Sequence, residues 1–242
     1  MDSSDRREIL SRVAAGTMTP EEAAAQLESL GQAEPQAASR IRLVRVIKQL
    51  GPAEIVGDPT VRDAIADGPH RARIDGDVMV IEGESSDEPG GFIFGFGRNL
   101  GNDRLLVRMN PSLPLDLQVQ AGSCRVQGVK AEIRAEVQAG SASIDGFVKP
   151  LDLSVQAGSV RASGRLDEGD CRIGCDAGSV NLHLERGSSV RIQARASMGK
   201  VTLPAGEMVA GVEGGRDVTI GDGRASLRIE ANLGSVNVSA DR

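Results

Sequence analysis

Apolar and polar side chains alternate strictly through the middle of this chain, and a glycine interrupts the alternation at regular intervals. The pentapeptide VQAGS begins at Val119, Val137 and Val155, 18 residues apart each time. Related segments with a glycine in the same place begin at Cys175, Ala196 and Ala231. We expect Gly215, in the segment GGRDVTI, to supply the glycine that is missing between the last two.

The residues seven, five and three positions before each of these glycines are apolar or small, and polar side chains lie between them. Before Gly158, for example, Leu151, Leu153 and Val155 alternate with polar residues such as Asp152. A period of two predicts strands with one buried face and one face in solvent. The glycine is expected at a corner, where a sharp turn leaves no room for a Cβ.

A repeat of about 18 to 20 residues indicates a solenoid, in which each coil stacks on the strands of the coil below at about 4.8 Å. The sequence therefore predicts a mainly β fold, a single-stranded β-helix. We expect it to be right-handed, because parallel crossover connections almost always are.

The same alignment places all three cysteines, Cys124, Cys171 and Cys175, on the inward face of their strands. We interpret them as buried small apolar side chains, with a metal or catalytic thiol as the weaker alternative. Cys171 and Cys175 lie four residues apart on one strand, about 13 Å, which is too far for a disulfide. An odd number of cysteines also fits a reducing compartment better than a disulfide framework.

Residues 1–31 have the pattern of a short α-helical hairpin. The segment TPEE, from Thr19, carries a capping box with Pro20 at the first helical position, and Gly31 is a natural stop. An apolar stripe runs along the hairpin and consists of Ile9, Leu10, Val13, Leu27 and Leu30. So short a hairpin cannot bury this stripe alone, so the stripe is a candidate interface for a second copy, another protein, a membrane or the rest of the chain. Residues 32–40 are expected to be a linker, and residues 41–242 the β-solenoid domain.

The segment PGGFIFGFGRNLG, from Pro89, holds Phe92, Phe94 and Phe96, three of the four phenylalanines in a chain without Trp or Tyr. It lies between a hairpin predicted at Asp75-Gly76 and the strand RLLVRMN. The three rings share a face on an extended strand, so they form a candidate membrane or partner loop. We favour the alternative that this segment covers the solenoid core.

Composition narrows the choice of partner and compartment. The net charge is -6, which argues against nucleic acid as a partner because phosphate binding requires a basic surface. The sequence contains no apolar run long enough to span a membrane, and MDSSDRREIL lacks the hydrophobic region of a secretory signal. We therefore expect a cytoplasmic protein, with peripheral membrane contact left open.

The sequence contains no complete motif for nucleotide binding, catalysis or metal binding. GFGRNLG and ARASMGKVT imitate nucleotide-binding loops but miss required positions. His70 and His183 have no recognisable catalytic or metal-ligand spacing, and Asp152, Glu168 and Asp170 are interpreted as solvated charges. The sequence thus predicts no catalytic residue, no metal and no cofactor, and we expect a protein that is not an enzyme.

The VQAGS coils, the segment LGSVNV and the preceding hairpin ILSRVAAGTMTPEEAAAQLESL together resemble a bacterial family. The solenoid is similar to the toastrack, or adhesin-like, β-helix domain, and the hairpin to the SHOCT-type module. The resemblance implies a sensing or interaction module of bacterial envelope-stress systems, acting beside a membrane stress-response protein. It implies no catalytic residues, since the family has none established.

The leading hypothesis is an interaction or scaffold protein whose hairpin mediates oligomerisation or recruits a partner. One alternative is a self-assembling, bactofilin-like polymer, because an uncapped solenoid end exposes strand edges that template another copy. The other is reversible membrane association through Phe92, Phe94 and Phe96.

Overall fold

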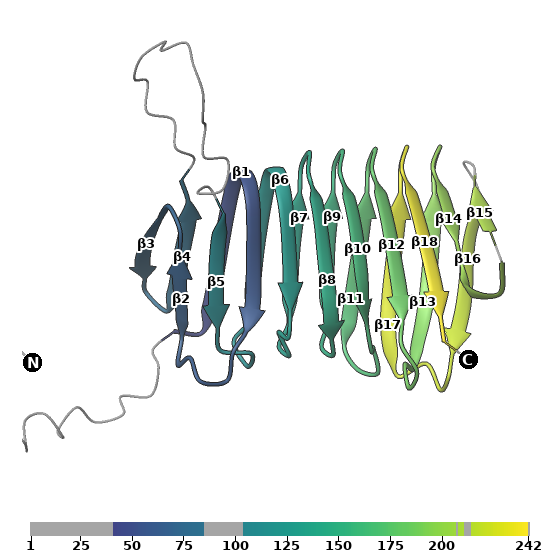
Figure 1. The fold of residues 1–242 in the computed structure, drawn as a ribbon. Helices are drawn as coiled ribbons and strands as arrows, with labels where there is room; N and C mark the ends of the chain where they lie inside the picture. The colour runs from purple at the N-terminus through teal and green to yellow at the C-terminus, as the bar shows by residue number, and fades with distance from the viewer. Residues whose placement is uncertain (1–40, 85–103, 207, 211–213, 242) are drawn as a thin grey trace, which may run out of the picture. The chain divides into compact units, whose positions relative to one another are not determined.

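The computed structural model describes residues 41–84, 104–206, 208–210 and 214–241. These residues form one 18-stranded sheet with a single short 3-10 helix, Pro204–Gly206 (Figure 1). The prediction of a mainly β chain is therefore confirmed for this part of the molecule. The predicted helical hairpin and the linker that follows it lie outside the described residues.

The strands form two stacks, in which each strand pairs with the strand of the next layer. The first stack runs in the spatial order β3 (His70–Asp75), β4 (Val78–Gly83), β1 (Leu43–Gly57), β6 (Leu115–Gln127), β7 (Ile133–Val137), β9 (Leu151–Val155), β11 (Asp170–Cys175), β17 (Ala225–Ala231), β13 (Val190–Ala196) and β16 (Gly214–Ile220). The second runs β2 (Ala64–Asp67), β5 (Leu105–Met109), the later halves of β1 and β6, β8 (Ser141–Phe147), β10 (Ser159–Gly164), β12 (Ser179–Leu184), β18 (Ser235–Ala240), β14 (Lys200–Thr202) and β15 (Met208–Ala210).

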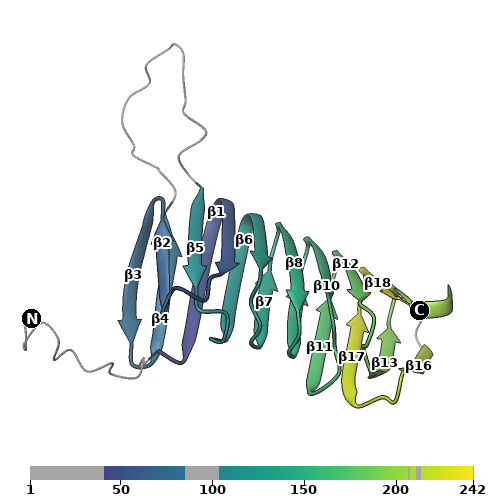
Figure 2. The ribbon, with the colours of Figure 1, turned by 60° about the horizontal axis from the view of Figure 1, so that its bottom comes forward.

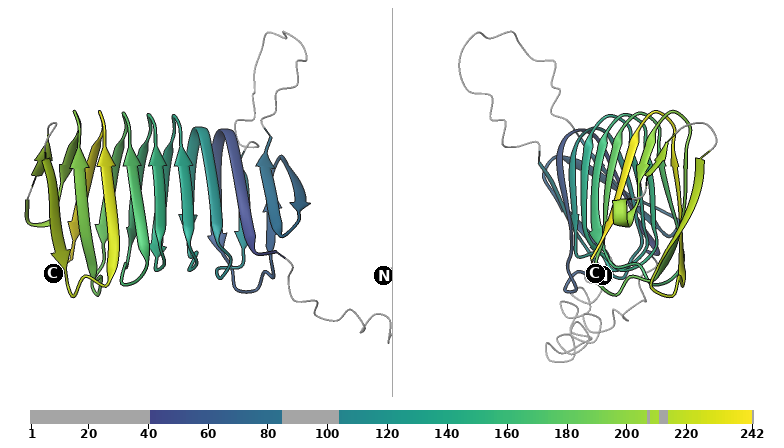
Figure 3. Two further views of the ribbon diagram at one scale, coloured as in Figure 1. Left: turned by 180° about the vertical axis from the view of Figure 1, so that it is seen from behind. Right: turned by 90° about the vertical axis from the view of Figure 1, so that its right-hand side faces the viewer.

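The pairing brings the aligned apolar positions into register from layer to layer. Leu115 pairs with Ile133, and Ile133 pairs with Leu151. Cys171 pairs with Leu227, which in turn pairs with Ile192. Each of these side chains is at most 5% exposed, so the inward columns form one continuous apolar core between the stacks. The view along the layers shows the strands nearly superimposed around this interior (Figure 3).

The corners between the two stacks are held by hydrogen bonds between successive layers. The amides of Ala139, Ala157 and Ala177 donate to the carbonyl oxygens of Gln120, Gln138 and Gln156, at 2.7–2.8 Å. This spacing brings each repeat glycine onto the glycine of the layer before it. The contacting pairs are Gly51 and Gly122, Gly122 and Gly140, Gly140 and Gly158, Gly158 and Gly178, Gly178 and Gly234, and Gly234 and Gly199. A Cβ on the second glycine of each pair would overlap the backbone of the first, so the glycine is required by the contact between layers rather than by the turn alone.

The spatial order of the layers differs from their order in the sequence. The chain leaves β12 for β13 and β14, and the final strands β17 and β18 then insert between β11 and β13 and between β12 and β14. The yellow β18 is visible between β12 and β14 in Figure 1, and β17 between β11 and β13 in Figure 2. The expectation that Gly215 continues the parallel series is wrong, because Gly215 lies in β16, which runs antiparallel to β13. It sits opposite Arg195 at the end of the first stack, with no glycine beneath it.

Antiparallel strands form both ends of the stack. At one end β3 pairs with β4 and β2 pairs with β5, and at the other β16 pairs with β13 and β15 with β14, all antiparallel. The predicted hairpin at Asp75-Gly76 is confirmed, since it joins β3 to β4. Two ion pairs, Arg71 with Glu84 and Arg73 with Glu82, place charge along the β3 edge. Charged edge strands discourage the addition of further strands.

Two large side chains in the core were not expected there. Phe147, expected at a turn between coils, ends β8 and is 1% exposed, and its ring occupies the space left by Gly164. Lys48 is fully buried in β1, where it pairs with Gly83 and Val119. Its stem lies over Gly83, and its Nζ donates to the carbonyl oxygen of Glu84 at 3.4 Å.

Replacing a corner glycine should destabilise the whole stack. In Gly158→Ala the new Cβ would lie 2.8 Å from Val137 Cγ1 and would also overlap the Gly140 carbonyl oxygen. Forcing one methyl group into such a contact costs about 1–3 kcal/mol. We expect the free energy of unfolding to fall by that amount in urea denaturation followed by circular dichroism.

Gly174→Ala is the matched control, because the nearest heavy atom to its Cβ would be the Leu153 carbonyl oxygen at 3.9 Å. Stability should change by no more than about 0.5 kcal/mol in this variant. Equal losses in the two variants would contradict the role assigned to the contact between corner glycines.

Candidate functional site

The outward side of the second stack carries polar side chains in columns, one residue per layer. The first column is a run of hydroxyls in register, formed by Ser123, Ser141, Ser159, Ser179 and Ser235. The second column contains two arginines and consists of Glu54, Arg125, Ser143, Arg161, Asn181 and Asn237. Both columns follow from the period of two, which turns every second side chain outward.

A hollow of about 590 Å³ lies along these two columns. It forms at β8, whose outward Ser141 and Ser143 are small, between the long side chains of Arg125 on β6 and Arg161 on β10. The two arginines are separated by two layers, about 10 Å at the usual strand spacing. The sequence GSAS at Gly140 thus makes a gap between two guanidinium groups.

The hollow has an excess of positive charge. Arg104, Arg125 and Arg161 line it, and Glu54 is its single carboxylate. Arg104 and Glu54 form an ion pair at one end. Within the part of the chain that the structure describes, no carboxylate lies within ion-pair distance of Arg125 or Arg161.

Asp145 is the nearest acidic residue along β8, but it belongs to the next outward column and does not line the hollow. Its carboxylate accepts hydrogen bonds from Ser143 at 3.3 Å and from Ser163 at 3.2 Å. Both guanidinium groups therefore remain available to a ligand.

A second hollow, of about 410 Å³ on the first stack, has a different charge balance. Arg172 and Arg228 line it, but so do Glu132, Asp152 and Asp170. Carboxylates outnumber arginines there, so this hollow does not select for an anion. The arginine pair on the second stack is the better candidate for a binding site.

His183, which the sequence places outward on a strand, has two polar neighbours. Its Nδ1 lies 3.0 Å from Ser239 Oγ, and its Nε2 lies 3.3 Å from Asp241 Oδ1. A serine, a histidine and an aspartate also form hydrolytic triads, but those lie in sites that exclude water. Here the side chains of His183 and Asp241 are 44% and 46% exposed on an open sheet face. We interpret the group as a solvent-exposed cluster of polar side chains.

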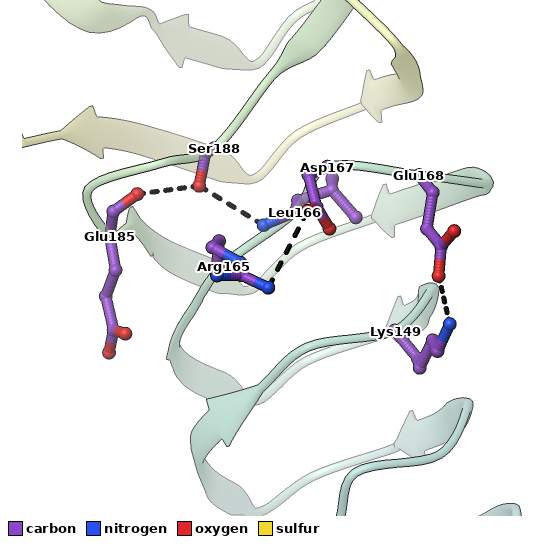
Figure 4. Close-up of polar contacts among 7 residues, drawn as sticks. All are labelled: Lys149, Arg165, Leu166, Asp167, Glu168, Glu185 and Ser188. Carbon is purple, nitrogen blue, oxygen red and sulfur yellow. Dashed lines mark hydrogen bonds and ion pairs between the residues drawn. The ribbon is translucent and has the colours of Figure 1, made fainter.

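Of the acidic residues that the sequence grouped together, Asp152 and Asp170 both line the hollow of the first stack and Glu168 does not. Each has its own polar partner. Asp152 pairs with Arg134 at 3.8 Å, and Asp170 accepts a hydrogen bond from Ser226. Figure 4 shows the turn at one edge of the stack, where Glu168 pairs with Lys149.

In the same turn region Arg165 pairs with Asp167 at 3.6 Å (Figure 4). Ser188 Oγ donates to the Glu185 carbonyl oxygen and accepts from the Leu166 amide, at 2.7 and 3.2 Å. These contacts hold neighbouring turns together and leave no convergent group for catalysis among them.

The three cysteines are free and buried, as the alignment predicts. Burial raises the pKa of the Cys124 thiol from 9.0 to about 12. Burial likewise raises the pKa of Cys171 to about 11, against the opposing effect of the Leu151 amide, which donates to its sulfur at 3.2 Å. The pKa of Cys175 is raised for the same reason. All three are therefore neutral thiols near pH 7, without the thiolate character of a nucleophile.

The candidate interface residues named from the sequence lie outside the described residues. These are Ile9, Leu10, Val13, Leu27 and Leu30 of the hairpin and Phe92, Phe94 and Phe96 of the loop. Within the described residues, no group of three or more His, Cys, Asp or Glu side chains could hold a metal ion. Among the same residues, no helix has the length and apolar character needed to cross a membrane.

Sequence reasoning missed Arg125, Ser143 and Arg161 as a group, although the signal was present. The turn serines and the outward Gln120, Gln138 and Gln156 recur visibly in the sequence, whereas the position two residues after each turn serine varies from coil to coil. Aligned in the same way, SCR, SAS and SVR from Ser123, Ser141 and Ser159 display an Arg–Ser–Arg column beside three serines.

Comparison with known proteins finds few relatives. No family model matches the chain, and no curated protein matches it. Among solved structures, the chain is similar to one described as the "crystal structure of a putative cell adhesion protein from Clostridium sporogenes ATCC 15579". The TM-score is 0.43 with 17% sequence identity, over 86% of this chain and 96% of that one. A TM-score of this size does not establish a common fold.

The buried thiol of Cys124 should make stability fall at alkaline pH. Its pKa is about 12 in the folded protein and 9.0 when exposed, so the folded state holds the proton more tightly. Stability is therefore complete below pH 9 and is lost as the pH rises toward 12. We expect Cys124→Ala to have a shallower loss than the wild type over this range in urea denaturation.

Val126→Ala, also in β6 and 1% exposed, is the matched core variant without a titrating group. Relative to the wild type, it should lower the free energy of unfolding by a similar amount at every pH, because it keeps Cys124. If Cys124→Ala loses stability with pH as steeply as Val126→Ala does, the thiol does not have the raised pKa.

Proposed function

We propose that this chain is a non-enzymatic interaction protein whose stacked layers form a rigid, right-handed β-solenoid that presents its second stack to an acidic partner. The observation that carries the proposal is the hollow between Arg125 and Arg161, where two arginines without a carboxylate partner face solvent over small side chains. Unpaired arginines in a hollow are a recurrent feature of sites for carboxylate and phosphate groups.

The rigidity of the surface supports this role. The inward columns and the hydrogen-bonded corners fix the spacing of the outward side chains, so the site is formed before a ligand arrives. Preorganised groups bind with a smaller loss of conformational entropy than mobile ones. The fold thus fixes the positions of the outward side chains, and these side chains make the contacts with the ligand.

The resemblance to the toastrack and SHOCT-type modules supports a wider assignment within the same proposal. We assign the protein to bacterial envelope-stress sensing or signalling, beside a membrane stress-response protein and with a cytoplasmic location. The hairpin of residues 1–31 would then mediate oligomerisation or recruit that partner. Peripheral membrane contact through the Phe-rich segment stays a prediction.

End-to-end polymerisation is the less favoured alternative. A further copy would have to add at an antiparallel end strand, whereas the rest of the stack grows by parallel pairing. The charged β3 edge also works against such addition.

If Arg125 and Arg161 serve binding, they should contribute little to stability. We expect Arg125→Ser with Arg161→Ser, which continues the serine of β8, to change the free energy of unfolding by no more than about 0.5 kcal/mol. Arg45→Ser should lower it by about 0.5–1 kcal/mol, because Arg45 Nε donates to Asp116 at 2.8 Å between adjacent layers. A loss in the double variant as large as that of Arg45→Ser would make the pair structural and remove the basis of the proposal.

The hairpin is tested by its removal. We expect the full chain to have a mass above that of the monomer in light scattering coupled to size exclusion, and a chain lacking residues 1–31 to be monomeric. The variant Leu27→Asp, within the predicted apolar stripe, should act like the deletion, since a buried charge opposes association. An unchanged mass in both variants would exclude the hairpin as the oligomerisation element.

A further inference from the structure

We infer that the hollow of the second stack binds a linear acidic polysaccharide that lies along the stack, across the strands, with anionic groups on alternate sugars. This inference rests on the proposed function and names the class of ligand for its site. The contacts that carry it are Arg125, Arg161 and the serine column beside them.

The spacing of the arginines fits such a chain. Arg125, Ser143 and Arg161 are in direct register, so the two guanidinium groups project from layers separated by one intervening strand. In an extended sugar chain one residue is about as long as one layer, so carboxylates on alternate sugars fall about 10 Å apart, the distance of two layers. Each guanidinium can then bind one carboxylate through two parallel hydrogen bonds.

The serine column supplies the repeating contacts between the charges. Ser123, Ser141 and Ser159 line the hollow with one hydroxyl per layer. A hydroxyl both donates and accepts, as do the hydroxyls of a sugar, so either partner can take either role at every layer. The small side chains of β8 leave the intervening sugar room above Ser143.

The ligand has to be acidic, because this surface offers nothing on which a neutral sugar ring could stack. Among the described residues Phe147 is the single Phe, Tyr or Trp, and it is 1% exposed in the core. Without an aromatic platform, affinity depends on charge-assisted hydrogen bonds, which are stronger than neutral ones.

An acidic peptide is the competing class of macromolecule and fits less well. The side chains between its carboxylates would need pockets, whereas the hollow is lined between the serines and arginines by Ala53, Cys124 and Ala142, whose side chains belong to the core. A polysaccharide presents hydroxyls at those places, and the serine column matches them.

The experiment measures binding of three polymers to the full-length protein by isothermal titration calorimetry. A hyaluronan octasaccharide has a carboxylate on every second sugar, a cello-oligosaccharide of the same length has none, and poly-L-glutamate is the acidic peptide. We expect the octasaccharide to bind, the neutral sugar not to bind, and poly-L-glutamate to bind more weakly. Binding should weaken as salt is raised.

Two variants test the site by different routes. Arg125→Ala with Arg161→Ala should weaken octasaccharide binding by at least about tenfold, through the loss of two charge-assisted contacts. Ser143→Gln leaves every charge in place but fills the gap between the arginines, and it should weaken binding similarly. Circular dichroism and thermal melting establish that each variant is folded.

The matched control is Arg172→Ala with Arg228→Ala. These arginines face solvent on the first stack in adjacent layers, so the control removes the same charge from the other side of the molecule. Its binding should equal that of the wild type. If the control loses as much affinity for the octasaccharide as Arg125→Ala with Arg161→Ala, binding depends on the overall charge of the protein, and the proposed site is wrong.

The remaining outcomes separate this inference from the proposed function. If poly-L-glutamate binds as tightly as the octasaccharide through the same arginines, the hollow is a site for acidic partners but not for a polysaccharide. If neither acidic polymer binds, both proposals are overturned. If the neutral cello-oligosaccharide binds as tightly as the octasaccharide, the arginines do not determine binding, and the inference is overturned.

Discussion

The structure depends on one contact, the meeting of corner backbones in successive layers. The amide of each corner residue donates to a carbonyl oxygen one layer away, and the glycine beside it lies against the glycine of the previous layer. Because glycine has no Cβ, the layers can approach to hydrogen-bonding distance at the corner as well as along the strands. That shared spacing keeps both stacks in register through the bend, so one set of columns runs through the whole described sheet.

The ends of the stack are built differently from its middle. A purely parallel stack would expose a strand edge at each end, with free amides and carbonyls ready to pair with another chain. Here the first strand β1 and the final strands β17 and β18 lie inside the stack, with a neighbour on either side. The outermost positions are given to antiparallel strands, which reverse direction and end the parallel series. β1, β17 and β18 thus pair on both sides, as the strands in the middle of the stack do.

The sequence predicts the features that recur in every coil, but it does not predict the spatial order of the layers. Inward columns, buried cysteines and glycine corners follow from a period of two within a period of about 18, because each coil carries the pattern. The insertion of β17 does not follow, since Leu227 fits equally well against Cys171 or any other apolar member of its column. Gly215 does not stack on a corner glycine, because its strand β16 runs antiparallel to β13. Lys48 could have been found, because it stands three residues before Gly51, as Val119 stands before Gly122.

The candidate site follows from the separation that a period of two imposes between the two faces of a strand. Inward residues such as Ala142 and Ile144 pack in the core, while Ser143 between them lies on the outward face. Outward residues can therefore be substituted without disturbing the register of the strands. The register then places their side chains at fixed intervals along the stack. A ligand that repeats along its own length is the natural counterpart of such a surface, because each layer offers it the same geometry. The Arg–Ser–Arg column adds positive charge to this repeating surface, whereas carboxylates outnumber arginines in the hollow of the first stack. For that reason the second stack is the face that we propose for binding.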